Sequence, residues 1–211
     1  MTTSTVLHTT LKKKTSSTTG KGLERAQDII AAACEIFATE GYAGLSMRQV
    51  ALRAGMKLSN VQHYFQNKEM LVEAALLYTL SAMQEKIDRI ATIPGTSRIE
   101  QFHAAVDAML AAMRDPQPLA MHFECWALAS RLPFAAALME RMRKRETRAM
   151  LALIKGLAPG ISDDEYARRA DLIVAMLNGL MTQLRHAGMG RQRKTLEAAA
   201  RRALVMLATQ A

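Results

Sequence analysis

Apolar residues recur at spacings of three and four along most of the chain, which is the periodicity of one face of an α-helix. No segment alternates apolar and polar residues for long enough to predict a β-sheet. Gly and Pro positions interrupt the helical pattern and divide it into about nine stretches. We expect helices at residues 23–40, 46–54, 57–65, 68–90, 98–114, 119–131, 133–157, 163–187 and 192–209.

The composition also favours an all-α fold. Half of the 211 residues are apolar, which is enough for a substantial core, and only 5% are aromatic. Ala, Leu and Met, which are strong helix formers, dominate. The net charge of +9 favours a polyanionic partner such as DNA. This charge is not confined to one end, because residues 1–70 carry 9 basic and 5 acidic side chains and residues 71–211 carry 19 and 14.

The most informative segment follows position 45. Ser46 and, three residues later, Gln49 form a capping-box pattern that begins a helix. Gly55 supplies the backbone conformation that ends this helix, and a second helix over residues 57–65 must start almost at once. Two short helices joined by a glycine turn predict a helix-turn-helix, whose second helix fits the major groove of DNA.

Many residues at fixed spacing in the first third of the chain resemble the TetR family of bacterial transcriptional regulators. They are Arg25, Ile29, Ile30, Ala33, Phe37, Gly41, Tyr42, Ser46, Met47, Arg48, Val50, Ala51, Ala54, Gly55, His63, Tyr64, Phe65, Lys68, Glu69 and Leu71. The resemblance implies a three-helix DNA-binding domain over residues 23–70 and a larger helical ligand-sensing and dimerisation domain over residues 71–211. It implies three partners: double-stranded operator DNA, a second copy of the chain and a small-molecule effector.

The resemblance also implies roles for individual residues in DNA binding. Arg48 is a candidate base contact, and Tyr64 and Lys68 match positions that hold phosphate. His63 could contact phosphate or sugar. Gln62 stands where many family members have Tyr, and because Gln and Asn can read adenine the base preference should be this chain's own. The groove-facing end of the second helix comprises Lys57, Leu58, Ser59, Asn60 and Gln62.

Composition indicates an N-terminal tail and a boundary between the predicted domains. Residues 1–22 are rich in Thr, Ser and Lys and predict a disordered basic tail, whose Lys12–Lys14 run either touches DNA or is simply solvated. The Pro94–Thr96 break is the expected boundary before the second domain.

No stretch is apolar enough for a signal peptide or a membrane span, and neither cysteine lies in a pairing motif. We therefore expect a cytoplasmic protein that does not bind membranes.

The second domain is expected to hold its effector in a mostly apolar pocket, although Met and aromatic residues at helical spacing also suit plain core. Glu124 beside Trp126 would suit a cationic ligand, but consecutive helical residues point apart. His103, His122 and Cys125 lack a tight metal-ligand spacing, so no metal or cofactor is expected. The residues expected to line the pocket are Phe102, Met121, His122, Phe123 and Trp126.

The last two helices carry broad apolar stripes. The resemblance implies that these two helices form a four-helix interface with a second copy, and the alternative is ordinary core within one chain. The expected interface residues are Ile173, Leu177, Met181, Leu184 and Leu204.

Together these patterns predict a dimeric, ligand-responsive DNA-binding regulator, most often a repressor in this family. The chain has no glycine-rich phosphate loop, nucleophile elbow or His-Glu-x-x-His motif, so an enzyme is not expected. One alternative is a DNA-binding regulator without a small-molecule ligand, either constitutive or controlled by a protein partner. A weaker alternative is an α-helical enzyme or metal-binding module.

Overall fold

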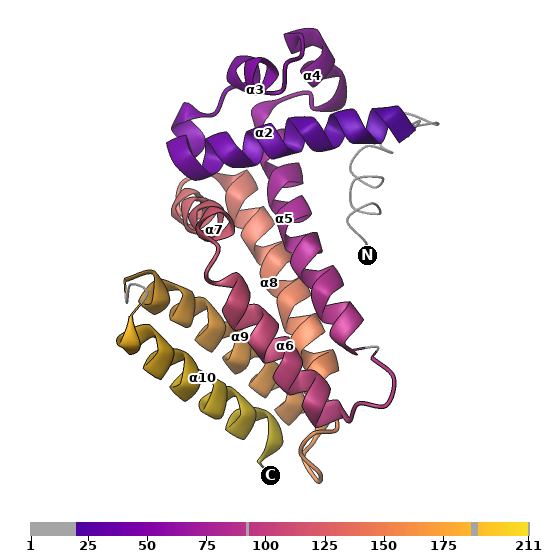
Figure 1. Ribbon diagram of the computed structural model, residues 1–211, viewed down its shortest axis with the longest axis vertical. Coiled ribbons are helices and arrows are strands. Elements are labelled where there is room, and N and C mark those ends of the chain that lie inside the picture. The colour runs from indigo at the N-terminus through magenta and orange to yellow at the C-terminus, as the bar shows by residue number, and fades with distance from the viewer. Residues whose placement is uncertain (1–19, 92, 187–189, 211) are drawn as a thin grey trace. The chain divides into compact units, whose positions relative to one another are not determined.

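A computed structural model describes residues 20–91, 93–186 and 190–210. Within this part of the chain there are nine helices and no strand, which confirms the predicted all-α architecture (Figure 1). The helices span Gly20–Gly44 (α2), Met47–Arg53 (α3), Leu58–Tyr64 (α4), Lys68–Ala91 (α5), Arg98–Ala112 (α6), Pro116–Ala129 (α7), Pro133–Ile154 (α8), Asp163–His186 (α9) and Arg191–Thr209 (α10).

Most helix ends lie close to their expected positions. Helix α2 begins at Gly20 rather than at residue 23, so the last residues of the predicted tail are helical. The remainder of that tail, including Lys12–Lys14, lies outside the described residues. The predicted cap at Ser162 is confirmed, because its hydroxyl accepts the Glu165 backbone N–H at 3.2 Å.

The described residues pack as two compact units. The first comprises residues 20–85 and 116–138, and the second comprises residues 86–115 and 139–210. Helix α7, which the sequence placed in the second domain, packs against α2 in the first unit. The two packing units therefore do not coincide with the predicted domain division at residues 70/71, nor with the break at Pro94–Thr96. Helices α5 and α8 each contribute residues to both units.

Helix α2 buries an apolar stripe in the first unit. Its Ile29, Ile30 and Phe37 are at most 1% exposed, as their helical spacing predicts. Val61 of α4 and Phe65 just after it are buried to the same degree. The two short helices α3 and α4 are thus fixed by a shared core rather than by their own length, which is below that of a stable isolated helix.

The core of the second unit is built from α6, α8, α9 and α10. It includes Phe102, Ile154, Ile173, Leu184 and Leu204, all at most 1% exposed. Helices α9 and α10 pack side by side in this unit (Figure 1).

The residues predicted to form a dimer interface pack within one copy of the chain. Ile173, Leu177, Leu184 and Leu204 are buried in the core of their own unit, and Met181 packs against that core. Their stripe is therefore the one that faces inward, which is the alternative that the sequence left open.

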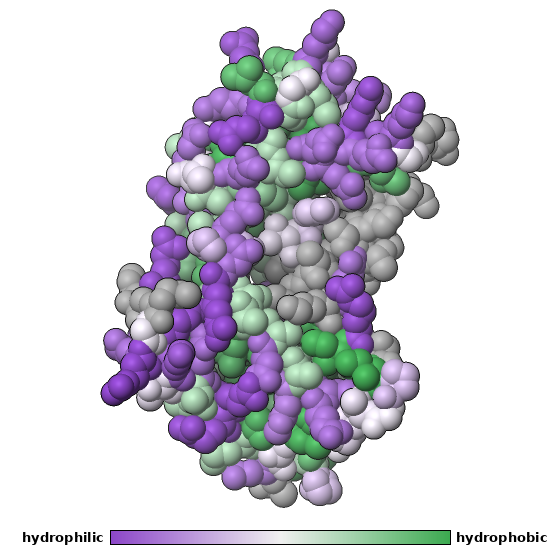
Figure 2. Space-filling model, viewed as in Figure 1, coloured by the Kyte–Doolittle hydropathy of each residue, from purple (hydrophilic) through white to green (hydrophobic). Residues whose placement is uncertain are grey.

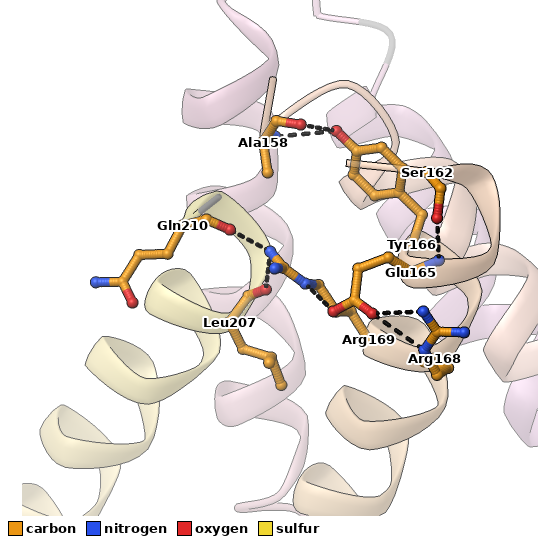
Figure 3. A network of polar contacts seen from close by, with 8 residues as sticks. All are labelled: Ala158, Ser162, Glu165, Tyr166, Arg168, Arg169, Leu207 and Gln210. Atoms are coloured by element: carbon orange, nitrogen blue, oxygen red, sulfur yellow. Dashed lines mark hydrogen bonds and ion pairs between the residues drawn. The ribbon is translucent and has the colours of Figure 1, made fainter. Parts of the chain in front are cut away.

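A polar network fastens the end of α10 to the start of α9 (Figure 3). The Arg169 guanidinium donates to Glu165 at 2.8 Å, and also to the backbone carbonyls of Leu207, at 3.2 Å, and Gln210. The Tyr166 hydroxyl donates to the Ala158 carbonyl at 2.5 Å. The two bonds from Arg169 to Leu207 and Gln210 satisfy carbonyls at the C-terminus of α10, and the Tyr166 bond holds the segment that follows α8.

A second, buried ion network joins α6, α9 and α10. Arg193, only 8% exposed, donates to the Glu197 carboxylate at 2.9 Å and to the carbonyls of Leu184 and Met113 at 3.1 and 2.9 Å. Arg114 reaches the other oxygen of Glu197 at 2.7 Å. The Leu184 and Met113 carbonyls lie at the C-terminal ends of α9 and α6, so the network closes one end of the second unit.

None of the helices in the described ranges combines the length and the apolarity that crossing a membrane requires.

Candidate DNA-binding interface

The start of α3 is capped by the side chain predicted to cap it. The Ser46 hydroxyl oxygen accepts the Gln49 backbone N–H at 3.2 Å. The Gln49 side-chain oxygen accepts the Ser46 hydroxyl at 2.8 Å and its amide nitrogen donates to Glu40 at 3.4 Å, so this side chain contacts both the cap residue and α2. Arg48, between these two residues, is left exposed.

The turn between α3 and α4 has the geometry that only glycine adopts easily. Gly55 has φ +63°, and its N–H donates to the Leu52 carbonyl at 3.2 Å. The Met56 N–H reaches back to the Ala51 carbonyl at 2.8 Å. This pair of bonds is a Schellman motif, and it ends α3 sharply enough for α4 to begin at Leu58.

Helix α4 presents a polar face to solvent. Val61 is fully buried beneath it, whereas the side chains of the opposite face are exposed. Leu58 and Tyr64 are half-buried, and the Tyr64 ring meets His63 edge-on at 5.4 Å. Hydrophilic side chains predominate over α2, α3 and α4 in the space-filling view (Figure 2). The exposed residues are Lys57, Ser59, Asn60, Gln62 and His63.

The start of α5 lies next to this face in the chain. The Asn67 side chain accepts the Met70 N–H at 2.9 Å, which confirms the predicted cap. The Lys68 ammonium lies 3.8 Å from the centre of the Tyr42 ring. Desolvation lowers the pKa of Lys68, and burial, reinforced by a hydrogen bond to Glu69, raises the pKa of Tyr42 to about 12.

All nine residues predicted to touch DNA are at least partly exposed, and all nine lie in one short part of the first unit. A neighbouring cation, the Arg53 guanidinium, pairs with Glu35 at 3.0 Å. The sequence did not identify Tyr42, Glu69 or Glu124 as part of this site. Tyr42 and Glu69 belong to the matching motif, but Glu124 is 82 residues from Tyr42 and has no local signal.

The five residues predicted to line an effector pocket do not gather in one unit. Phe102 is fully buried in the core of the second unit, and the other four lie on α7 in the first. There Met121 is buried, while the rings of Phe123 and Trp126 each lie 6.1 Å from the ring of His122. Burial lowers the pKa of His122 to about 4, so this imidazole is neutral at pH 7.

The chemistry of α7 does not favour a metal. No group of three or more potential metal ligands occurs among the described residues. Both cysteines are free and buried, and desolvation raises the pKa of each thiol to about 11. The Glu124 carboxylate accepts the Tyr42 backbone N–H at 2.8 Å, so it is engaged away from Trp126.

A second exposed surface lies on the outward faces of α9 and α10. Leu172 and Met176, one turn apart on α9, are 54% and 39% exposed, and Met206 of α10 is 52% exposed. Ala175 and Gly179 are exposed on the same face of α9. We call the surface made by these five residues the outer apolar face.

Comparison with known families matches both parts of the chain. Residues 29–75 match the family model described as bacterial regulatory proteins, tetR family. Residues 98–209, more than half of the chain, match the model described as BetI-type transcriptional repressor, C-terminal. An uncharacterized HTH-type transcriptional regulator in the dhlA 5′ region of Xanthobacter autotrophicus is 33% identical over 109 residues, which are 51% of this chain and 54% of that protein. The chain thus matches about half the length of this relative.

Solved structures of low sequence identity share the fold. A transcriptional regulator from Rhodococcus sp. superposes with a TM-score of 0.69 at 22% identity, over 86% of this chain and 95% of that one. A TetR-family regulator from Mesorhizobium loti gives 0.67 at 24% identity, over 87% and 95%. A transcriptional regulator from Saccharomonospora viridis, solved in complex with choline, gives 0.66 at 18% identity, over 84% and 93%.

Proposed function

We propose, from the premise that this chain belongs to the TetR family of DNA-binding transcriptional regulators, that it is a homodimeric repressor released from a palindromic operator by a small molecule. The helix-turn-helix geometry carries the proposal: a Schellman turn at Gly55 sets α4 against a shared core with its polar face outward. Such a helix fits the major groove, and two copies about 34–36 Å apart match successive turns of DNA. Its site of action would be the cytoplasm.

Within this proposal the exposed side chains divide into two roles. Arg48 and the amides of Asn60 and Gln62 can make bidentate hydrogen bonds to base edges. Lys68, Tyr64 and the N-terminus of α5 suit phosphate, because cations and helix starts attract anions. Lys57, Leu58, Ser59 and His63 would complete the surface against the groove wall.

We expect Arg48→Ala or Gln62→Ala to weaken binding to the operator by about 1–3 kcal/mol while leaving binding to random DNA nearly unchanged. Both residues are exposed and neither supports the core, so the variants should fold normally. Fluorescence anisotropy with matched operator and random duplexes measures the difference. Ser130→Ala, at an exposed position beyond α7, serves as a control. Equal weakening on both duplexes would remove the base-reading role.

Dimerisation would use the outer apolar face. Apolar side chains of this size exposed together on neighbouring helices are common at protein interfaces, and Ala175 and Gly179 would permit close helix approach. A four-helix contact between α9 and α10 of two copies would bury them.

The effector would bind at the His122, Phe123 and Trp126 cluster of α7. Aromatic faces attract cations, and choline, the ligand of the Saccharomonospora viridis regulator, is therefore a sensible first probe among quaternary ammonium compounds. Helix α7 packs directly on α2 in the first unit, and α2 in turn packs on α3, which contacts α4. A ligand that shifts α7 would therefore also shift the helices that support α4. A ligand that favours such a form would lower the population able to bind the operator.

We expect a compound that releases the operator to change the fluorescence of Trp126, which is the only tryptophan in the chain. Trp126→Ala should reduce affinity for a cationic effector by about threefold to thirtyfold. Since Trp126 is 54% exposed, its removal should leave folding and ligand-free DNA binding intact. Trp126→Phe, which keeps an aromatic face, is the matched control. Unchanged release by the same compound in Trp126→Ala would place the effector elsewhere.

A further inference from the structure

Tyr42 is held at three points, and each contact uses a different part of the residue. Its hydroxyl donates to Glu69 at 3.0 Å, its backbone N–H donates to Glu124 at 2.8 Å, and its ring lies 5.8 Å from that of Phe134. All four residues belong to the first unit. The ring is therefore fixed in position and in tilt.

The backbone before Tyr42 is shaped to admit Glu124. Gly41 interrupts the helical conformation of α2 with φ +68°. A Cβ atom placed on Gly41 would lie 2.9 Å from Glu124 Oε1, closer than real side chains approach. Glycine adopts this positive φ readily and leaves room for the carboxylate, which ties α7 to the segment that carries the Tyr42 ring.

The face of the Tyr42 ring supports the Lys68 ammonium. Lys68 Nζ lies 3.8 Å from the ring centre, and Lys68 forms no ion pair with any residue that the structure describes. A cation over an aromatic face needs no acceptor for its N–H groups, so these donors stay available for another partner. The ring also restricts a long, flexible side chain, which then loses less conformational entropy when it binds.

We propose that Tyr42, fixed by Glu124, is a positioning residue that presents Lys68 to the DNA phosphate backbone. This inference rests on the proposed function, in which Lys68 contacts phosphate. It adds that the strength of this contact depends on a carboxylate of α7 far away in the sequence. A purely structural role for Tyr42 would instead lower stability without acting through Lys68.

A double-mutant cycle on a random-sequence DNA duplex tests the inference, because phosphate contacts do not depend on sequence. Lys68→Ala should reduce the slope of log affinity against log salt by about 1. Tyr42→Leu should weaken binding by about threefold to tenfold in the natural background and by less than about twofold once Lys68 is absent. Tyr42→Phe, which keeps the ring face, should bind nearly as the natural protein does.

Variants of Glu124 provide the second arm. Glu124→Ala should weaken binding in the presence of Lys68 only, whereas Glu124→Gln, whose amide oxygen still accepts the Tyr42 N–H, should restore most of the affinity. Thermal melts of each variant identify any loss of fold. The Tyr42–Lys68 cycle and the Glu124 variants test different contacts, so one experiment can fail while the other succeeds.

The outcomes separate this inference from the function on which it rests. Independent, multiplicative effects of Tyr42→Leu and Lys68→Ala would overturn the positioning role, as would full affinity in Tyr42→Leu. An unchanged salt slope in Lys68→Ala would also overturn it while leaving DNA binding intact. Failure of the natural protein to bind any duplex would reject the proposed function itself.

Discussion

Replacing Met176 with Asp is expected to convert the proposed dimer to monomers and to weaken operator binding on the order of a hundredfold or more. Met176 lies on the outer apolar face, so the substitution would place two uncompensated carboxylates in the proposed interface, at a cost of several kcal/mol. Loss of the second recognition helix would then remove the advantage of binding two half-sites at once. Sedimentation equilibrium measures the first effect and a gel-shift titration the second.

Two further substitutions on α9 make this result specific. Met176→Leu keeps an apolar side chain at the same exposed position and should remain dimeric. Leu177→Asp changes the next residue, which is buried within its own unit, and should reduce the stability of the fold itself. An intact dimer in Met176→Asp, or a natural protein that sediments as a monomer, would contradict the proposed interface.

Replacing Glu197 with Ala is expected to lower the free energy of unfolding by about 3–5 kcal/mol, because it leaves the buried Arg193 guanidinium without its carboxylate. Urea unfolding followed by circular dichroism gives the value. Glu140→Ala is the matched control, since Glu140 pairs with Arg143 and Lys144 at the surface, where solvent screens the charges, and its loss should change the free energy of unfolding far less. A loss of similar size in both variants would show that the buried network adds little.

The same network predicts the direction of a pH effect. Hydrogen bonds from Arg114 and Arg193 lower the pKa of Glu197 below its ordinary value. The folded state therefore binds fewer protons at this site than the unfolded state does. The stabilisation that Glu197 contributes is fully present above the pKa of this carboxyl in the unfolded state, about 4.3. It is lost as the pH falls through the lower pKa of the folded state. Glu197→Ala should flatten the stability profile in that acidic range.

Local signals predicted the helices and the turn well. Gly55, Ser46 and Asn67 each act through atoms within a few residues, so their chemistry can be deduced from the sequence alone. The exposed residues of α4 were predictable for the same reason, because Val61 fixes which face of the helix is buried.

Contacts between distant segments could not be predicted in this way. Helix α9 carries apolar residues on two faces. The exposed Leu172 and Met176 directly precede the buried Ile173 and Leu177 in the sequence. Periodicity shows that both faces are apolar but not which one the chain buries itself. The bond from Tyr42 to Glu124 spans 82 residues and depends on α7 packing against α2, which no spacing rule indicates.

Footprinting of the protein on genomic fragments selected by binding would test the proposed function. We expect an enriched palindromic sequence with two protected half-sites on one face of the DNA, centred about one helical turn apart, or 10–10.5 base pairs. Protection of these half-sites should disappear in Arg48→Ala at concentrations that saturate the natural protein. Recovery of fragments with no common sequence, or a single protected patch that Arg48→Ala leaves unchanged, would contradict it.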